Sequence, residues 1–289
     1  MTKALYIFCV FLFVGGLLYQ FAPLKTFNFL IPKDAGSRLR MANIAYGPET
    51  QQRLDIYEPA TKSGLKPVLV FVHGGSWQEG NKADYEFVGR AFAARGYLTL
   101  VIGYRALPKN AYPDFVTDVA LVTKWATLNA PEYGGDGHNI FLVGHSAGAY
   151  NATLAVLDER YIRDVNLSPS VIKAVATLAG PFDFLPLDSP ITIATFGHLK
   201  DLASTQPINF ARADAPPFLL LHGTNDNTVY PKNSRSLRAH LIEKGGHATA
   251  IEYRGVTHVG ILLDIAKPLR NNAPVLDDID SFFKGILKQ

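Results

Sequence analysis

Short apolar runs that alternate with helical patterns are the feature of this sequence that most limits its fold. Continuous apolar stretches occur at residues 67–72, 98–102 and 140–143, and such runs are typical of strands buried on both faces of a sheet. Apolar residues at helical spacing separate these runs, as expected for the crossovers that join parallel strands. The pattern therefore predicts an α/β protein with a doubly wound, mostly parallel sheet and flanking helices.

The rest of the chain extends this pattern on both sides. Residues 53–57 alternate apolar and polar side chains, which predicts a half-exposed strand. Further strands are expected at residues 173–178, 218–222 and 248–253, and helices at residues 147–157, 231–244 and 276–287. The proline-rich stretch at residues 181–217 has weak periodicity, so we expect a short cap region there.

The first 22 residues differ in character from the rest. Residues 4–19 carry no charged side chain and would form about 24 Å of helix; with residues 20–22 they reach the lower end of the roughly 17–25 residues that span a bilayer. Lys3 gives the basic start that a secretory signal also has. No clear cleavage signal follows, so we expect an uncleaved membrane anchor at residues 1–22 rather than a cleaved signal.

Two locations follow from these alternatives. The protein is membrane-anchored through residues 4–22 if the segment is retained, and periplasmic or secreted if it is a cleaved signal. More basic residues follow the segment than precede it, which would place the rest of the chain in the cytoplasm and leaves the orientation open. After this segment we expect a linker at residues 23–48 and one large domain at residues 49–289.

Charge and cysteine content exclude several classes of protein. The chain has 28 basic and 25 acidic side chains, a formal net charge of +3, with no long run of one sign. Nucleic acid is therefore not an expected partner, since its binding proteins concentrate positive charge. Cys9 is the one cysteine of the sequence, so an intrachain disulfide and a CxxC metal or redox site are excluded.

The segment Gly144-His145-Ser146-Ala147-Gly148 has the form G-x-S-x-G between a predicted strand and a predicted helix. This is the context of a nucleophile elbow, in which a sharp turn exposes the serine at the edge of the sheet. The glycines remove side chains that would clash in so tight a turn, and the helix N-terminus offers backbone N–H groups. We therefore expect Ser146 to be a nucleophile.

A second glycine-rich loop, His73-Gly74-Gly75-Ser76-Trp77, follows the predicted strand at residues 67–72. Adjacent glycines allow the backbone to approach a ligand closely. We expect the N–H groups of Gly74 and Gly75 to stabilise a developing oxyanion together with that of Ala147. His73 is expected to brace the loop through hydrogen bonds, and Trp77 fits a pocket wall and the core equally well.

A serine hydroxyl needs a base, and the base needs an orienting carboxylate. Asp226 lies in a loop directly after the predicted strand at residues 218–222, where ligands bind in open α/β sheets. The other acidic residues considered, Asp183, Asp201 and Asp214, lie in the cap-like stretch or ahead of that strand. We therefore expect Asp226 to be the acid.

The base is expected among the histidines that follow the acid. His258 lies in the glycine-flanked loop after the predicted strand at residues 248–253, whereas His247 lies in a helix-ending turn. We favour His258. The remaining histidines, His138, His145, His198, His222 and His240, are expected to be structural or exposed.

Taken in order, these motifs resemble the α/β-hydrolase superfamily, in its esterase and lipase-like branch with a His-Gly-Gly loop. The resemblance covers residues 50–285 and includes Tyr104-Arg105 and His222-Gly-Thr-Asn-Asp226. Relatives of this branch include short-chain carboxylesterases, prenylcysteine methylesterases and arylformamidases. Two positions at which hormone-sensitive-lipase-like proteins carry Asp and a third loop glycine hold His145 and Ser76 here, which favours the simpler esterase branch.

The resemblance implies an eight-stranded sheet, the triad Ser146–His258–Asp226 and a pocket that includes Trp77, His145 and Tyr104. It implies an acyl-enzyme mechanism that uses no metal or organic cofactor, and a small-molecule ester as substrate. The short cap favours short acyl chains. Two alternatives stay open: an amide hydrolase such as a formamidase, and a catalytically silent membrane-tethered binding protein that kept the fold.

Overall fold

The computed structural model describes residues 23–61 and 64–288. The anchor or signal expected at residues 1–22 lies outside the described residues. In the described part of the chain, no helix is both long and apolar enough to cross a membrane.

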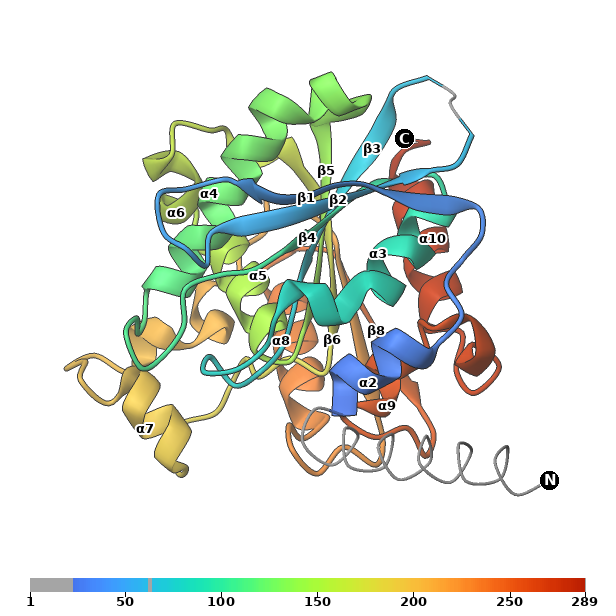
Figure 1. The fold of residues 1–289 in the computed structure, drawn as a ribbon. Coiled ribbons are helices and arrows are strands. Elements are labelled where there is room, and N and C mark those ends of the chain that lie inside the picture. The colour runs from blue at the N-terminus through green and yellow to red at the C-terminus, as the bar shows by residue number, and fades with distance from the viewer. Residues whose placement is uncertain (1–22, 62–63, 289) are drawn as a thin grey trace.

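An eight-stranded sheet forms the centre of the fold, as the resemblance to the α/β-hydrolases implied (Figure 1). Its spatial order is β1-β2-β4-β3-β5-β6-β7-β8. The strands β1 and β2 pair antiparallel with their neighbours, and every later pair is parallel. The bounds are β1 Ser37–Ala45, β2 Arg53–Pro59, β3 Lys66–Val72, β4 Leu98–Ile102, β5 Gly135–His145, β6 Ile172–Leu178, β7 Phe218–Gly223 and β8 Ala248–Tyr253.

Helices cover both faces of this sheet. Figure 1 shows α4, α5 and α6 on one side and α3 and α10 on the other. The core is accordingly divided into two clusters of buried side chains, one on each face. The bounds are α2 Pro23–Leu30, α3 Glu86–Ala94, α4 Asp114–Asn129, α5 Ala147–Leu157, α6 Arg160–Asp164, α7 Pro190–Phe196, α8 Lys232–Glu243, α9 Gly260–Leu263 and α10 Val275–Ile286.

The prediction of a linker at residues 23–48 is wrong. This stretch contains α2 and β1, and β1 pairs along its length with β2. The ion pair between Asp34 and Arg270, at 2.7 Å, fixes the connection between them to the C-terminal part of the chain. The sequence did not predict β1 because it is an edge strand whose side chains are mostly exposed. The run of apolar residues that indicates a buried strand is therefore missing.

The strand expected to be half-exposed is buried on both faces. In β2 every residue after Arg53 is buried, including Asp55 and Glu58. Asp55 pairs with Lys82 at 2.6 Å, and Glu58 accepts hydrogen bonds from two arginines of β1. Asp55 and Glu58 therefore form ion pairs in the interior and do not face solvent.

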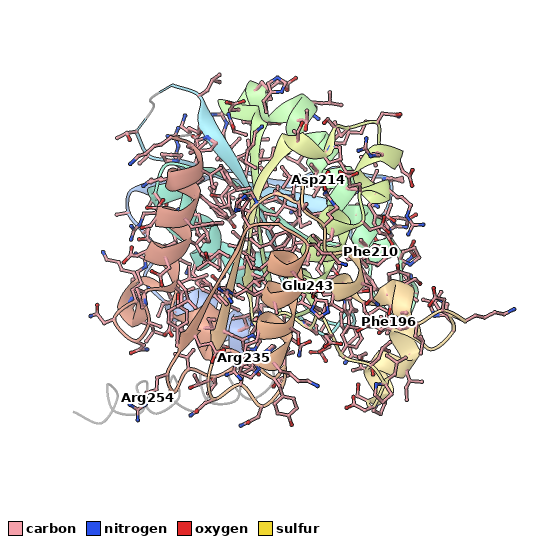
Figure 2. All side chains as sticks on the ribbon, turned by 180° about the vertical axis from the view of Figure 1, so that it is seen from behind. Phe196, Phe210, Asp214, Arg235, Glu243 and Arg254 are labelled. Atoms are coloured by element: carbon pink, nitrogen blue, oxygen red, sulfur yellow. The ribbon has the colours of Figure 1, made fainter. Side chains whose placement is uncertain are left out.

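The cap segment, residues 181–217, contains α7 and short 3₁₀ turns. It projects from the sheet beyond α5, at the lower right of Figure 2 around the label of Phe196. The Phe196 ring packs edge-on against Trp77, with centroids 5.1 Å apart. The cap segment is thus attached to the His-Gly-Gly loop through aromatic packing.

A buried ion pair fixes the start of α4. The Asp118 side chain is fully buried and accepts hydrogen bonds from the Arg105 guanidinium at 2.7 and 2.9 Å. We expect Arg105→Met to lower the free energy of unfolding by about 3–5 kcal/mol, because it leaves Asp118 charged and unpaired. Denaturant unfolding measures this change. Arg163→Met, which removes a surface pair of α6, is the matched control, with an expected loss of at most about 0.5 kcal/mol; equal losses would contradict the account.

Candidate active site

A sharp turn between β5 and α5 places Ser146 at the edge of the sheet. Ser146 has φ 53° and ψ −122°, a conformation that L side chains rarely adopt. A side chain on Gly148 would lie 2.1 Å from the Val72 carbonyl oxygen, and one on Gly144 would lie 2.5 Å from the Ala149 Cα. The two flanking glycines therefore allow the turn, as the G-x-S-x-G pattern predicted.

Three side chains that are far apart in the sequence meet at this turn. The Ser146 Oγ lies 2.9 Å from the His258 Nε2, and the His258 Nδ1 lies 2.7 Å from the Asp226 Oδ2. The second carboxylate oxygen of Asp226 accepts the backbone N–H groups of Thr228 and Val229, each at 2.9 Å. Because the carboxylate accepts the Nδ1 proton, the Nε2 of His258 is free to accept the proton of the serine hydroxyl.

Asp226 is held ionised by its surroundings. Burial alone would raise its pKa, but hydrogen bonds from His222, His258 and the Val229 N–H hold that pKa well below the ordinary value. The carboxylate therefore keeps its charge across the neutral range and can accept the Nδ1 proton of His258.

His222 also belongs to the site. The sequence predicted only that it is structural or exposed. It is fully buried at the end of β7, with its Nε2 2.7 Å from the Val229 carbonyl oxygen and 3.1 Å from the Asp226 Oδ2. Its Nδ1 is bonded to the Ser234 hydroxyl at 2.8 Å. The available signal was its place near the end of the strand, four residues before Asp226.

His145 contacts His258 directly. Its Nε2 donates to the backbone carbonyl of His258 at 3.0 Å, and the two rings lie 5.1 Å apart. Burial and the neighbouring His258 lower its pKa to about 3. His145 therefore stays neutral and fixes the loop that carries His258, and it also lines a cavity beside Ser146.

The His-Gly-Gly loop, residues 73–77, lies against the elbow. In the described part of the chain, no acceptor is bonded to the N–H of Gly74, Gly75 or Ala147. The predicted bracing by His73 is confirmed: its Nδ1 bonds to the Gly74 carbonyl oxygen at 2.7 Å, and its ring stacks on Tyr104 at 4.6 Å. Burial lowers the pKa of His73 to about 4, so the brace stays uncharged.

A side chain at Gly74 would disturb this loop directly. The added Cβ would lie 2.9 Å from the His145 Nδ1 and 3.1 Å from the Ser146 Cβ. We expect Gly74→Ala to lower kcat about 10²–10³-fold, the effect of losing one oxyanion donor. Steady-state kinetics on a chromogenic ester measures this loss. Gly285→Ala, at a position with open space around it, should leave kcat unchanged; wild-type kcat in Gly74→Ala would show that the loop does not contribute.

Two cavities meet at Ser146. The cap cavity, about 440 Å³, lies between the cap segment and α8, and Trp77 and Ala147 are among its lining residues. The α2 cavity, about 310 Å³, lies between α2, the His-Gly-Gly loop and the loop after His258. Trp77 is 4% exposed and packs on Tyr150 as well, so it is both pocket wall and core.

Tyr104 does not line either of these two cavities, contrary to its expected place in the pocket. It is buried behind the His-Gly-Gly loop, where its hydroxyl donates to the His73 carbonyl at 3.0 Å. The motif Tyr104-Arg105 therefore supports the loop and α4 rather than a substrate.

Of the acids and the histidine that the sequence analysis did not favour, only Asp183 lies at a cavity beside Ser146. Asp214 pairs with Arg212 at 2.7 Å, and Asp201 accepts from two backbone N–H groups within its own turn. The carbonyl of His247 bonds to Phe218 at the start of β7. Asp183 does line the cap cavity, but the hydrogen bonds of His258 go to Asp226 and Ser146.

Comparison with known proteins gives one family match. The model of a family described as BD-FAE matches residues 54–241, well over half of the chain. A probable isoprenylcysteine alpha-carbonyl methylesterase of Arabidopsis thaliana is 31% identical over 85% of this chain, and the esterase LipC of Mycobacterium tuberculosis is 30% identical over 78%. The match spans 54% and 60% of the lengths of these two relatives.

Solved structures agree in fold. The crystal structure of esterase B from Lactobacillus rhamnosus superimposes with a TM-score of 0.80 over 100% of this chain and 98% of its own, at 20% identity. The expected α/β-hydrolase fold is thereby confirmed. At this level of identity the likeness concerns the fold alone.

Proposed function

The chain belongs to the BD-FAE family, and from this premise we propose that it is a serine hydrolase that cleaves carboxylic esters through an acyl-enzyme on Ser146. One observation carries the proposal: an unbroken hydrogen-bonded relay from Ser146 through His258 to Asp226, seated at a strained elbow. The names of the relatives, an esterase and a methylesterase, support an ester as the substrate.

The first half-reaction forms the acyl-enzyme. His258 takes the hydroxyl proton as the Ser146 Oγ attacks the carbonyl carbon, and Asp226 stabilises the imidazolium that results. The N–H groups of Gly74, Gly75 and Ala147 are available to the oxyanion. When the carbon–oxygen bond to the alcohol breaks, His258 returns the proton to the leaving oxygen.

The second half-reaction repeats these steps with water. His258 removes a proton from the water molecule, the resulting hydroxide attacks the acyl carbon, and Ser146 leaves with the proton returned by His258. The carboxylic acid is released and the free serine is restored. The groups of the chain supply every proton transfer of this cycle.

The side chains around Ser146 support a proposal for the size of the acyl group. The cap cavity of about 440 Å³ is closed on one side by the aromatic ring of Trp77 and by the cap segment. We propose a short acyl chain because Trp77 and the short cap segment bound the cavity on this side of Ser146, and the chain-length series below measures how long an acyl group it accepts.

A chain-length series tests the substrate class. The full chain is assayed on p-nitrophenyl acetate, butyrate, octanoate and palmitate, and on the matching p-nitroanilides. We expect turnover of acetate and butyrate, much slower turnover of palmitate, and anilides cleaved far more slowly than esters. Faster cleavage of the anilides than of the esters would favour the amide hydrolase, and no turnover of any substrate would favour a silent binding protein.

We further propose that residues 4–22 anchor the protein in a membrane. The support is the uncharged apolar run at residues 4–19 and the absence of a clear cleavage signal after it. Membranes from expressing cells, washed with alkaline carbonate, should retain the intact chain with its N-terminal methionine or Thr2. Release of the chain by the wash, or a chain shortened by about 20 residues, would contradict the proposal.

A further inference from the structure

The α2 cavity meets the cap cavity at Ser146 but has a different chemical character. Its walls outside the catalytic groups are mainly side chains of Pro23, Leu24, Phe27, Val259, Leu262 and Leu263. None of the described residues that line it is an Asp, Glu, Lys or Arg. The cap cavity, by contrast, is lined by Asp183, Asp188 and Lys232. The α2 cavity therefore favours an apolar group.

Helix α2 is a fixed wall of this cavity. Asn28 is 8% exposed, its amide donates to the Ala83 carbonyl at 3.0 Å, and its Oδ1 accepts the Phe87 N–H at 3.1 Å. The Phe27 ring packs edge-on against Phe87, with centroids 5.3 Å apart. Helix α2 is thus bonded to the start of α3, and Figure 1 shows it beside α9, which forms the facing wall.

The position of His258 indicates which half of an ester this cavity receives. His258 lines the α2 cavity and not the cap cavity, and Ala147 lines the cap cavity and not the α2 cavity. In the proposed reaction the Nε2 of His258 gives its proton to the leaving alcohol oxygen, so the alcohol must extend on the side of His258.

We propose that the α2 cavity binds the alcohol half of the ester and selects apolar alcohols, with Leu24 and Phe27 of α2 as its specificity-determining side chains. The inference rests on the proposed function. The substrate class is therefore an ester of an apolar alcohol with a short acyl group, in which the acyl half occupies the cap cavity.

Two ester series separate the halves of the substrate. One keeps the acyl group constant (ethyl, butyl and hexyl butyrate), and the other keeps the alcohol constant (ethyl acetate, butyrate and hexanoate). Acid release at constant pH gives kcat/KM for each. Burial of the alcohol should raise kcat/KM by up to about fourfold per methylene in the first series.

The variants fill one cavity at a time. Leu24→Trp and Val259→Trp fill the α2 cavity from opposite walls; Val259 is 51% exposed and tolerates a larger side chain. Ile191→Trp narrows the cap cavity. Phe29→Trp, on the solvent side of α2 where Phe29 is 84% exposed, is the matched control. Thermal melting checks that each variant folds.

We expect Leu24→Trp and Val259→Trp to lower the hexyl-to-ethyl ratio of the alcohol series at least tenfold and to leave the ratios of the acyl series unchanged. Ile191→Trp should lower the hexanoate-to-acetate ratio of the acyl series and leave the ratios of the alcohol series unchanged. Phe29→Trp should change neither series. A shift of the acyl series by Leu24→Trp, or no shift of either series, would overturn the inference while esterase activity persists. A wild-type chain that cleaves no ester would overturn the proposed function and the inference together.

Discussion

Ser146→Ala should lower kcat for ester hydrolysis about a millionfold, to the level that binding and the oxyanion donors supply without a nucleophile. In the proposed mechanism the Ser146 Oγ gives its proton to the His258 Nε2, which lies 2.9 Å away. Alanine removes this oxygen without adding volume. Steady-state kinetics on p-nitrophenyl butyrate measures the loss.

The control for this change is a serine outside the site. Ser170→Ala removes an exposed hydroxyl that is bonded to Ser168, and it should leave kcat unchanged. Thermal melting should show that Ser146→Ala is folded. Activity of Ser146→Ala within tenfold of wild type would mean that another group attacks the ester.

Asp226→Asn should lower kcat about ten-thousandfold while the fold persists. An amide in this place presents its NH₂ to the Nδ1 of His258, because its oxygen accepts from Thr228 and Val229. The imidazole then keeps its proton on Nε2 and cannot accept the proton of Ser146. The kcat of the purified variant on p-nitrophenyl butyrate gives the magnitude.

The matched control is the same substitution at a carboxylate away from the relay. Asp214 is exposed and pairs with Arg212, so Asp214→Asn should retain wild-type kcat. A loss of less than tenfold in Asp226→Asn would show that His258 is oriented without this carboxylate.

The sequence predicted several central elements of the fold closely. The strands expected at residues 98–102 and 248–253 and the helix expected at residues 147–157 agree with β4, β8 and α5 to the residue. The members of the expected triad also lie in contact. The three residues meet because parallel strands of the sheet end at one edge, so that each motif directly after a strand reaches the same place.

Other features depend on contacts that the sequence does not reveal. Strand β1 is an exposed edge strand, and β2 buries Asp55 because Lys82, 27 residues later, pairs with it. His222 lies next to Asp226 because the loop after β7 folds back on the end of that strand. The apolar wall formed by α2 could not be predicted for the same reason. The hydrogen bonds of Asn28 to Ala83 and Phe87 and the packing of Phe27 on Phe87 place that helix beside the site.

The acyl-enzyme on Ser146 is the central claim, and rapid mixing of the full chain with p-nitrophenyl butyrate tests it most directly. We predict a burst of p-nitrophenol close to one equivalent of enzyme. Mass spectrometry of the acid-quenched protein should place one butyryl group on the peptide that contains Ser146. Turnover without a butyrylated peptide, or with the butyryl group on another residue, would contradict the account.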